Sequence, residues 1–99
     1  MEFQLTPDAA RLFADATAAL IRRRADIAQS EAERERWHIL YAAFRDADTA
    51  SVTVPRDAAN YMLYVWGTPD VWRDEQTRQM VKAQLRPQWK AQFPYCVHP

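Results

Sequence analysis

The segment that decides the fold reads AANYMLYVWGTPD, residues 58–70 of the 99-residue chain. Its first nine residues include one polar side chain, Asn60, if the tyrosines are counted as amphipathic. A helix that is apolar on nearly all sides is central rather than superficial. Gly67 follows where a left-handed helix cap is expected, and the Thr-Pro-Asp after it is a helix start signal. The segment predicts a central third helix at about 55–67, followed at once by a fourth.

Gly67 is also the only glycine in the chain. Glycine is the default residue where a backbone takes a positive φ or approaches a ligand closely. Phosphate-binding loops and dinucleotide fingerprints need several glycines at fixed spacing, so the composition argues against both. Alanine, arginine, glutamine and glutamate are frequent and favour helices. We therefore expect a helical protein without a nucleotide cofactor.

Two helices are predicted before the central segment. A Thr-Pro-Asp signal at residues 6–8 predicts the first helix, at about 7–29. A capping box that begins at Ser30 predicts the second, at about 30–47. The alternative is one continuous helix over 7–46, because no glycine or proline interrupts that range. The hairpin is favoured, since the apolar heptad of a coiled coil is not maintained.

The remaining segments complete the predicted fold. Residues 52–54 could be extended, although no strand partner is obvious. The fourth helix is predicted at about 69–86, because Pro87 argues for a stop. Residues 87–99 are expected to form an arm along the helices. The prediction for residues 1–99 is one all-α domain, a small four-helix bundle-like fold with an extended C-terminal arm.

The composition limits the partners. Hydrophobic residues make up 48% and charged residues 26% of the chain, and the net charge is zero. Zero net charge gives no general attraction to nucleic acid or to membranes. No apolar run approaches the ~20 residues of a membrane span, and the first residues are unlike a secretory signal. The single cysteine, Cys96, cannot form an intrachain disulfide. We expect a cytoplasmic protein with no membrane partner.

Residues that carry chemistry are sparse. Glu35 and His38 have the Glu-x-x-His spacing of di-iron sites, but the chain has no second copy of that spacing. Cys96 and His98 are too few for a zinc site, which needs about four ligands. No nucleophile has an evident base beside it. We expect no catalytic residues, no metal and no cofactor, and so not an enzyme.

The strongest positive signal is a row of basic residues. Arg78, Lys82, Arg86 and Lys90 are spaced four apart, and no acidic residue follows Glu75. Basic side chains on one helix face can hold phosphates while neighbouring aromatic rings stack on bases. The alternative is structural, because acids early and bases late in a helix suit its macrodipole. Nucleic-acid binding through the fourth helix is the second functional hypothesis.

Aromatic residues are the other signal. Four tryptophans, four tyrosines and four phenylalanines exceed what a small bundle readily buries, although each could instead fill the core. Tryptophan, tyrosine and arginine are enriched at interface hot spots. The candidate partner-binding residues are therefore aromatic or basic: Tyr64, Trp72, Arg78, Lys82, Arg86, Trp89, Lys90, Phe93 and Tyr95.

The leading functional hypothesis is a non-catalytic protein-binding module, an adaptor or inhibitor that occupies a surface of a larger protein partner. The small size and the composition rich in arginine and alanine suggest a phage or bacterial mobile-element regulator of host machinery. A homodimer is a further expectation, because Ile39 and Ala43 leave a second face of the second helix apolar.

Overall fold

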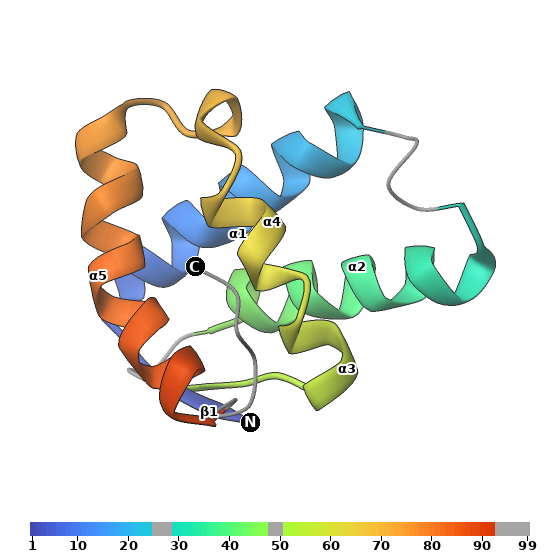
Figure 1. Ribbon diagram of the computed structural model, residues 1–99, viewed down its shortest axis with the longest axis horizontal. Coiled ribbons are helices and arrows are strands. Elements are labelled where there is room, and N and C mark those ends of the chain that lie inside the picture. The colour runs from blue at the N-terminus through green and yellow to red at the C-terminus, as the bar shows by residue number, and fades with distance from the viewer. Residues whose placement is uncertain (25–28, 48–50, 93–99) are drawn as a thin grey trace.

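The structure, a computed structural model, describes residues 1–24, 29–47 and 51–92. Its elements are β1 (Glu2–Gln4), α1 (Pro7–Arg23), α2 (Glu31–Arg45), β2 (Ser51–Thr53), α3 (Arg56–Ala59), α4 (Met62–Trp66), η2 (Pro69–Val71) and α5 (Glu75–Gln92). Helix α1 packs against α2 and, with another part of its surface, against α5. Helices α3 and α4 lie between α2 and α5 (Figure 1). The protein is mostly helical, which confirms the predicted class, with a small sheet added. Within the described residues, no helix has the length and apolar character needed to cross a membrane.

The caps recognised in the sequence form the first two helices. At the start of α1, Thr6 Oγ1 accepts a hydrogen bond from the Ala9 N–H at 3.2 Å. At the start of α2, Ser30 Oγ accepts one from the Glu33 N–H at 3.1 Å. Each bond satisfies a donor that the helix itself leaves free. The hairpin is therefore confirmed over a continuous helix, although α1 ends at Arg23, earlier than predicted.

The extended segment expected at 52–54 has a strand partner. Strand β2 pairs antiparallel with β1, with Phe3 opposite Val52, and the Val54 N–H donates to the Met1 carbonyl oxygen at 2.7 Å. Phe3 and Val52 are buried while their neighbours are more exposed, the alternation of a half-buried strand. Strand β1 escaped prediction because three residues are too few to show a period of two.

The third predicted helix is in fact two short helices. Helices α3 and α4 are separated by a turn at Asn60, where the Tyr61 N–H donates to the Ala58 carbonyl oxygen at 3.0 Å in an i→i−3 bond. After this turn the Tyr61 ring stacks on Trp37, with ring centroids 4.7 Å apart. The segment is still central, as its fully buried residues show: Ala58, Ala59, Met62 and Val65.

Gly67 ends α4, but it is not the predicted left-handed cap. Its φ of −84° and ψ of −3° lie in a region open to other residues. What distinguishes the position is space, because a Cβ there would lie 2.7 Å from the Leu63 carbonyl oxygen. The Gly67 N–H donates to the same oxygen at 2.9 Å. Glycine therefore permits a close backbone approach here rather than a positive φ.

The fourth helix begins later than predicted. The Thr-Pro-Asp signal starts only the 3-10 turn η2, and α5 begins at Glu75. Asp74 supplies the cap, since its Oδ1 accepts a hydrogen bond from the Thr77 N–H at 2.6 Å. The Thr77 side chain, then this backbone bond, and more weakly Arg73 lower the pKa of Asp74.

Pro87 does not end α5, which continues to Gln92. The predicted arm is therefore wrong for residues 87–92, and residues 93–99 lie outside the described chain. A proline inside a helix removes the hydrogen bond to the carbonyl four residues earlier, here that of Ala83. Ala83 and Pro87 are both exposed, so that carbonyl lies on the solvent side, where water can bond to it.

All four tryptophans belong to the core. Trp37, Trp66 and Trp89 are 2%, 3% and 2% exposed, and Trp72 is 7% exposed. The Phe13 ring links α1 to the later elements through edge or tilted contacts with Trp66 and Trp72. The bundle therefore buries more of its aromatic residues than we expected from its size.

Candidate functional site

Helix α5 carries three rows of side chains, each with members four residues apart. The core row is Thr77, Val81, Leu85 and Trp89, all buried. The glutamine row is Gln84, Gln88 and Gln92, and the basic row is Lys82, Arg86 and Lys90. Residues four apart are neighbours on a helix surface, so each row follows the helix axis. At 100° per residue, the glutamine row lies on one flank of the core row and the basic row on the other.

The core row fixes α5 against the rest of the protein. The indole N–H of Trp89 donates to the Ala59 carbonyl oxygen at 3.0 Å, and its ring meets Trp66 edge-to-face at 6.2 Å. Trp72, just before the helix, donates to the Val65 carbonyl oxygen at 2.8 Å. The expectation that Trp72 and Trp89 contact a partner is therefore corrected, because both rings are buried and bonded inside the protein.

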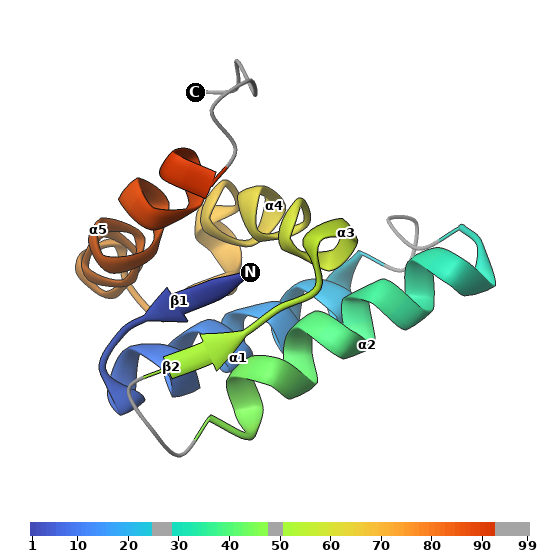
Figure 2. The ribbon, with the colours of Figure 1, turned by 90° about the horizontal axis from the view of Figure 1, so that it is seen from below.

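The middle of the glutamine row binds the outer edge of β1. Gln88 Oε1 accepts a hydrogen bond from the Gln4 N–H at 2.7 Å, and Gln88 Nε2 donates to the Gln4 carbonyl oxygen at 2.6 Å. One side-chain amide thus makes the two bonds that a neighbouring strand would make. Strand β1 lies between β2 and α5, with each of its edges occupied (Figure 2).

The two ends of the row extend this contact. Gln84 Oε1 accepts a hydrogen bond from the Thr6 N–H at 3.0 Å, and Gln92 Nε2 donates to the Glu2 carbonyl oxygen at 3.1 Å. The contacts fall on alternate residues, the strand residues Glu2 and Gln4 and then Thr6 just after the strand, because backbone groups alternate in direction along an extended segment. This role was not predicted from the sequence. The available signal was the spacing of the three glutamines beside a row of core residues.

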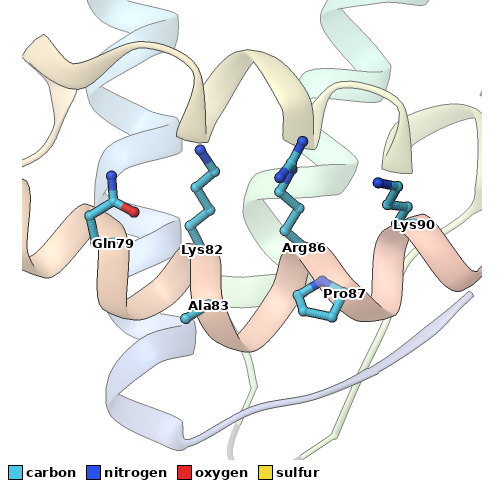
Figure 3. A pocket seen from close by; sticks show the side chains of 6 residues that line it. All are labelled: Gln79, Lys82, Ala83, Arg86, Pro87 and Lys90. Atoms are coloured by element: carbon cyan, nitrogen blue, oxygen red, sulfur yellow. The ribbon is translucent and has the colours of Figure 1, made fainter. Parts of the chain in front are cut away.

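The basic row lies on the other flank. Lys82, Arg86 and Lys90 extend side by side from one side of the helix (Figure 3). Among residues 1–24, 29–47 and 51–92, none of the three has a carboxylate within ion-pair distance. The row borders an open groove whose other lining residues are Gln79, Ala83 and Pro87. The groove therefore combines three positive charges with a strip of small, exposed apolar surface.

Arg78 does not belong to this row, although the sequence placed it there. Its side chain is 13% exposed, forms an ion pair with Glu75 at 2.8 Å, and donates to the Trp66 carbonyl oxygen. Hydrogen bonds from Arg78, and secondarily from Gln79, lower the pKa of Glu75 to about 2. Arg78 is thus bonded inside the protein, and the predicted row of four cations is corrected to three.

Tyr64 is the most exposed large hydrophobic side chain of the described residues, at 59%. Its ring contacts are with Trp37 and Tyr61, at 6.2 and 6.3 Å, so it belongs to the α2 side of α4. The structure therefore does not bring Tyr64 together with the basic row. The other two aromatic candidates, Phe93 and Tyr95, lie outside the described residues.

The Glu-x-x-His pair stands alone in the part of the chain that the structure describes. Glu35 and His38 are both exposed on α2. Within that same part, no three histidine, cysteine, aspartate or glutamate side chains gather closely enough to hold a metal ion.

Comparison of the chain with protein-family models, curated proteins and solved structures finds no match.

Proposed function

We propose that this protein is a non-catalytic protein-binding module, an adaptor or inhibitor, that occupies an acidic surface of a larger protein through the basic row of α5. One observation carries the proposal: Lys82, Arg86 and Lys90 project together from a fixed helix and pair with no carboxylate of the described residues. A row of like charges side by side repels itself, so an acidic partner would relieve that repulsion.

The contrast with the protein's other cations supports this reading. Five arginines, each with an aspartate or glutamate close by, form ion pairs within the protein: Arg11, Arg36, Arg45, Arg73 and Arg78. The chain has as many acidic as basic residues, so carboxylates are not scarce. The basic row is set apart because it forms no ion pair with these acids: Lys82 attracts Glu75 only through space, and Glu75 is bonded to Arg78 instead.

The rigidity of α5 also supports a binding role. The helix is held on one side by its core row and on a second side by the glutamine row. Side chains that project from a fixed element lose less freedom on binding than those on a loose segment. The basic row therefore presents a preformed pattern of charge.

Charge balance favours an acidic protein over nucleic acid. Proteins that bind duplexes through their phosphates commonly neutralise about 6–10 of them, and this row offers three cations on a chain of zero net charge. Trp89, which was expected to stack on bases, is in the core. A compact acidic surface needs neither a long positive track nor exposed rings.

Nucleic-acid binding remains the second candidate, because the basic row itself is the feature a phosphate backbone would contact. With three cations engaged on a duplex, the logarithm of the affinity should fall against that of the salt concentration with a slope of about −3. Binding that shows no such slope, or that survives reversal of charge at Lys82 and Arg86, contradicts this candidate.

The test is capture of partners from a bacterial lysate by the tagged chain, with and without nuclease, read by mass spectrometry. We expect a stoichiometric protein that survives nuclease. The same protein should be lost with the variant Lys82→Glu/Arg86→Glu/Lys90→Glu. The matched control, Lys82→Arg/Arg86→Lys/Lys90→Arg, keeps every charge and should retain it.

Two outcomes oppose the proposal. Capture that disappears with nuclease supports the nucleic-acid candidate. A protein retained equally by the charge-reversed variant shows that the binding face lies elsewhere. Circular dichroism of each variant must match the parent chain, so that loss of capture reports the surface rather than the fold.

Two finer proposals concern biological role and assembly. Small size and composition are the basis for proposing a cytoplasmic regulator from a phage or mobile element that acts on host machinery. A homodimer is proposed from α2, where Ile39 is 38% exposed and Ala43 is half-buried. Light scattering should then give twice the chain mass, and Ile39→Glu should restore the monomer.

A further inference from the structure

The geometry points to a specific occupant for the groove on α5: an acidic α-helix of the partner protein, laid along the helix from Gln79 to Lys90. Three of its carboxylates, four residues apart, pair with the basic row. A hydroxyl or amide side chain beside them donates to the Ala83 carbonyl oxygen. This inference rests on the proposed function and names the chemistry of the partner.

The spacing of the cations sets the first requirement. Members of the basic row follow one another at about 6 Å along the helix axis, from four residues at 1.5 Å each. Carboxylates at every fourth position of a second helix repeat at the same interval. All three pairs form together when the two axes run nearly side by side, which places the partner along the groove rather than across it.

The backbone of α5 sets the second requirement. Its N–H and C=O groups are used within the helix, so this face offers a partner almost no backbone bonds. An extended segment pressed against it would bury main-chain groups without partners. A helix satisfies its own main chain, and the small exposed side chains of Ala83 and Pro87 leave room for close approach.

Pro87 supplies the third requirement. It has no N–H to donate to the Ala83 carbonyl oxygen, which therefore lacks its usual partner within the helix, on the exposed side of the groove. Every cation of the basic row is a donor, so this oxygen is a different kind of contact in the same groove. A partner with both carboxylates and a nearby donor matches the groove, whereas a plain run of acids matches only part of it.

The probe is a synthetic helical peptide of about 18 residues, long enough to be held helical by a staple on its far face. It carries glutamate at three positions four apart, with one serine between two of them on the same face. The comparison probes are a scrambled peptide of the same composition with the same staple, and a short DNA duplex. Binding is followed by chemical shifts of the isotope-labelled full chain at low salt.

We expect the helical peptide to shift the amides of residues 79–90 and to bind several-fold more tightly than the scrambled peptide. Lys82→Gln/Arg86→Gln should weaken binding about tenfold, from the loss of two exposed charge pairs. Pro87→Ala restores an N–H for the Ala83 carbonyl. It should weaken binding about threefold while stabilising the helix, a combination that loss of folding cannot produce.

Three results would overturn the inference: equal binding of the scrambled peptide, tighter binding of the duplex, or affinity unchanged in both variants. The proposed function fails separately. If lysate capture still depends on the basic row but the helical peptide has no advantage over the scrambled one, the inference is wrong and the proposed function stands. If capture does not depend on the basic row, the proposed function is wrong.

Discussion

The two flanks of α5 use the same spacing for opposite purposes. Gln84, Gln88 and Gln92 bond to the backbone of the first residues of the chain, while Lys82, Arg86 and Lys90 bond to no carboxylate of the described residues. The difference comes from the side chains. An amide carries both a donor and an acceptor, as a strand edge does, whereas ammonium and guanidinium groups only donate.

A row of side chains on a helix surface is structural or available for binding according to whether the fold itself completes its hydrogen bonds and ion pairs. A strand edge needs a partner that alternates donors and acceptors, and the glutamine row provides one within the protein. It also covers an edge that could otherwise pair with another chain. The basic row makes no comparable contact with a strand edge of the described residues. Side chains whose bonding is complete inside the fold are structural, and those left without a partner are the candidates for binding.

The largest expected effect comes from removing the core row that positions both flanks. Trp89→Ala should lower the free energy of unfolding by about 3–5 kcal/mol, because it leaves a cavity under α5. Both the protection of β1 amides and the binding of the acidic peptide should then fail together. Urea unfolding measures the loss, and Lys90→Ala, next to it on the exposed side, is the control for stability alone, because Lys90 belongs to the basic row. A Trp89→Ala protein of parental stability would contradict the core assignment.

The glutamine row should come next. Gln84→Ala/Gln88→Ala/Gln92→Ala removes four hydrogen bonds to the N-terminal segment. We expect a loss of about 2–4 kcal/mol, at roughly 1 kcal/mol for each bond.

Hydrogen exchange gives this prediction a local readout. The amides of Gln4 and Thr6 should lose protection in the triple variant, while those of α2 change only with global stability. Gln76→Ala, an exposed glutamine at the start of the same helix, should leave both unaffected. Unchanged protection at Gln4 would show that the glutamines do not hold the strand.

A smaller, pH-dependent effect should separate Arg78 from the basic row it was first grouped with. The pKa of Glu75 is lowered from 4.5 to about 2, mainly by Arg78. The ion pair therefore contributes fully to the free energy of unfolding above about pH 4.5, and this contribution is lost as the pH falls through 2. Glu75→Gln should flatten that part of the stability curve. Urea unfolding at a series of pH values tests this, and an unchanged curve would contradict the pairing.

The smallest effect on stability is expected from the basic row itself. Lys82→Gln/Arg86→Gln/Lys90→Gln should change the free energy of unfolding by less than about 1 kcal/mol, as for exposed residues without partners. The same variant should abolish binding of the acidic peptide. A loss as large as that of the glutamine variant would mean that the basic row has a structural partner within the chain.

The sequence predicted best where local chemistry is sufficient. Thr6 and Ser30 cap their helices as expected, because a cap depends only on the next few residues. The predicted end of the helix at Pro87 is wrong. Proline removes the hydrogen bond to the Ala83 carbonyl, but this loss costs little here because that carbonyl lies at the surface. The sequence also did not predict the turn at Asn60, and it placed the start of α5 too early; both are errors in the boundaries of helices rather than in their existence.

The candidate site could be predicted only in part. The basic row is visible as a spacing, but nothing in the sequence says that Arg78 is occupied by Glu75 and Trp66. The tryptophans could not be divided between core and surface, because burial depends on elements distant in the chain. The strand β1 could not be predicted without knowing that the glutamine row covers its edge, and the role of the glutamines could not be predicted without knowing that β1 lies beside them.

The hydrogen bonds between the N-terminal segment and α5 also determine when the edge of β1 can be covered during folding and synthesis. They join residues that are 78 to 90 positions apart, in a protein whose other contacts are mostly helical. Contacts so distant slow folding relative to a helical bundle of similar size. During synthesis, the outer edge of β1 has no partner until the ribosome has released α5. Until then the backbone groups on that edge stay open to water and to pairing with another chain, so α5 is the element that closes the edge.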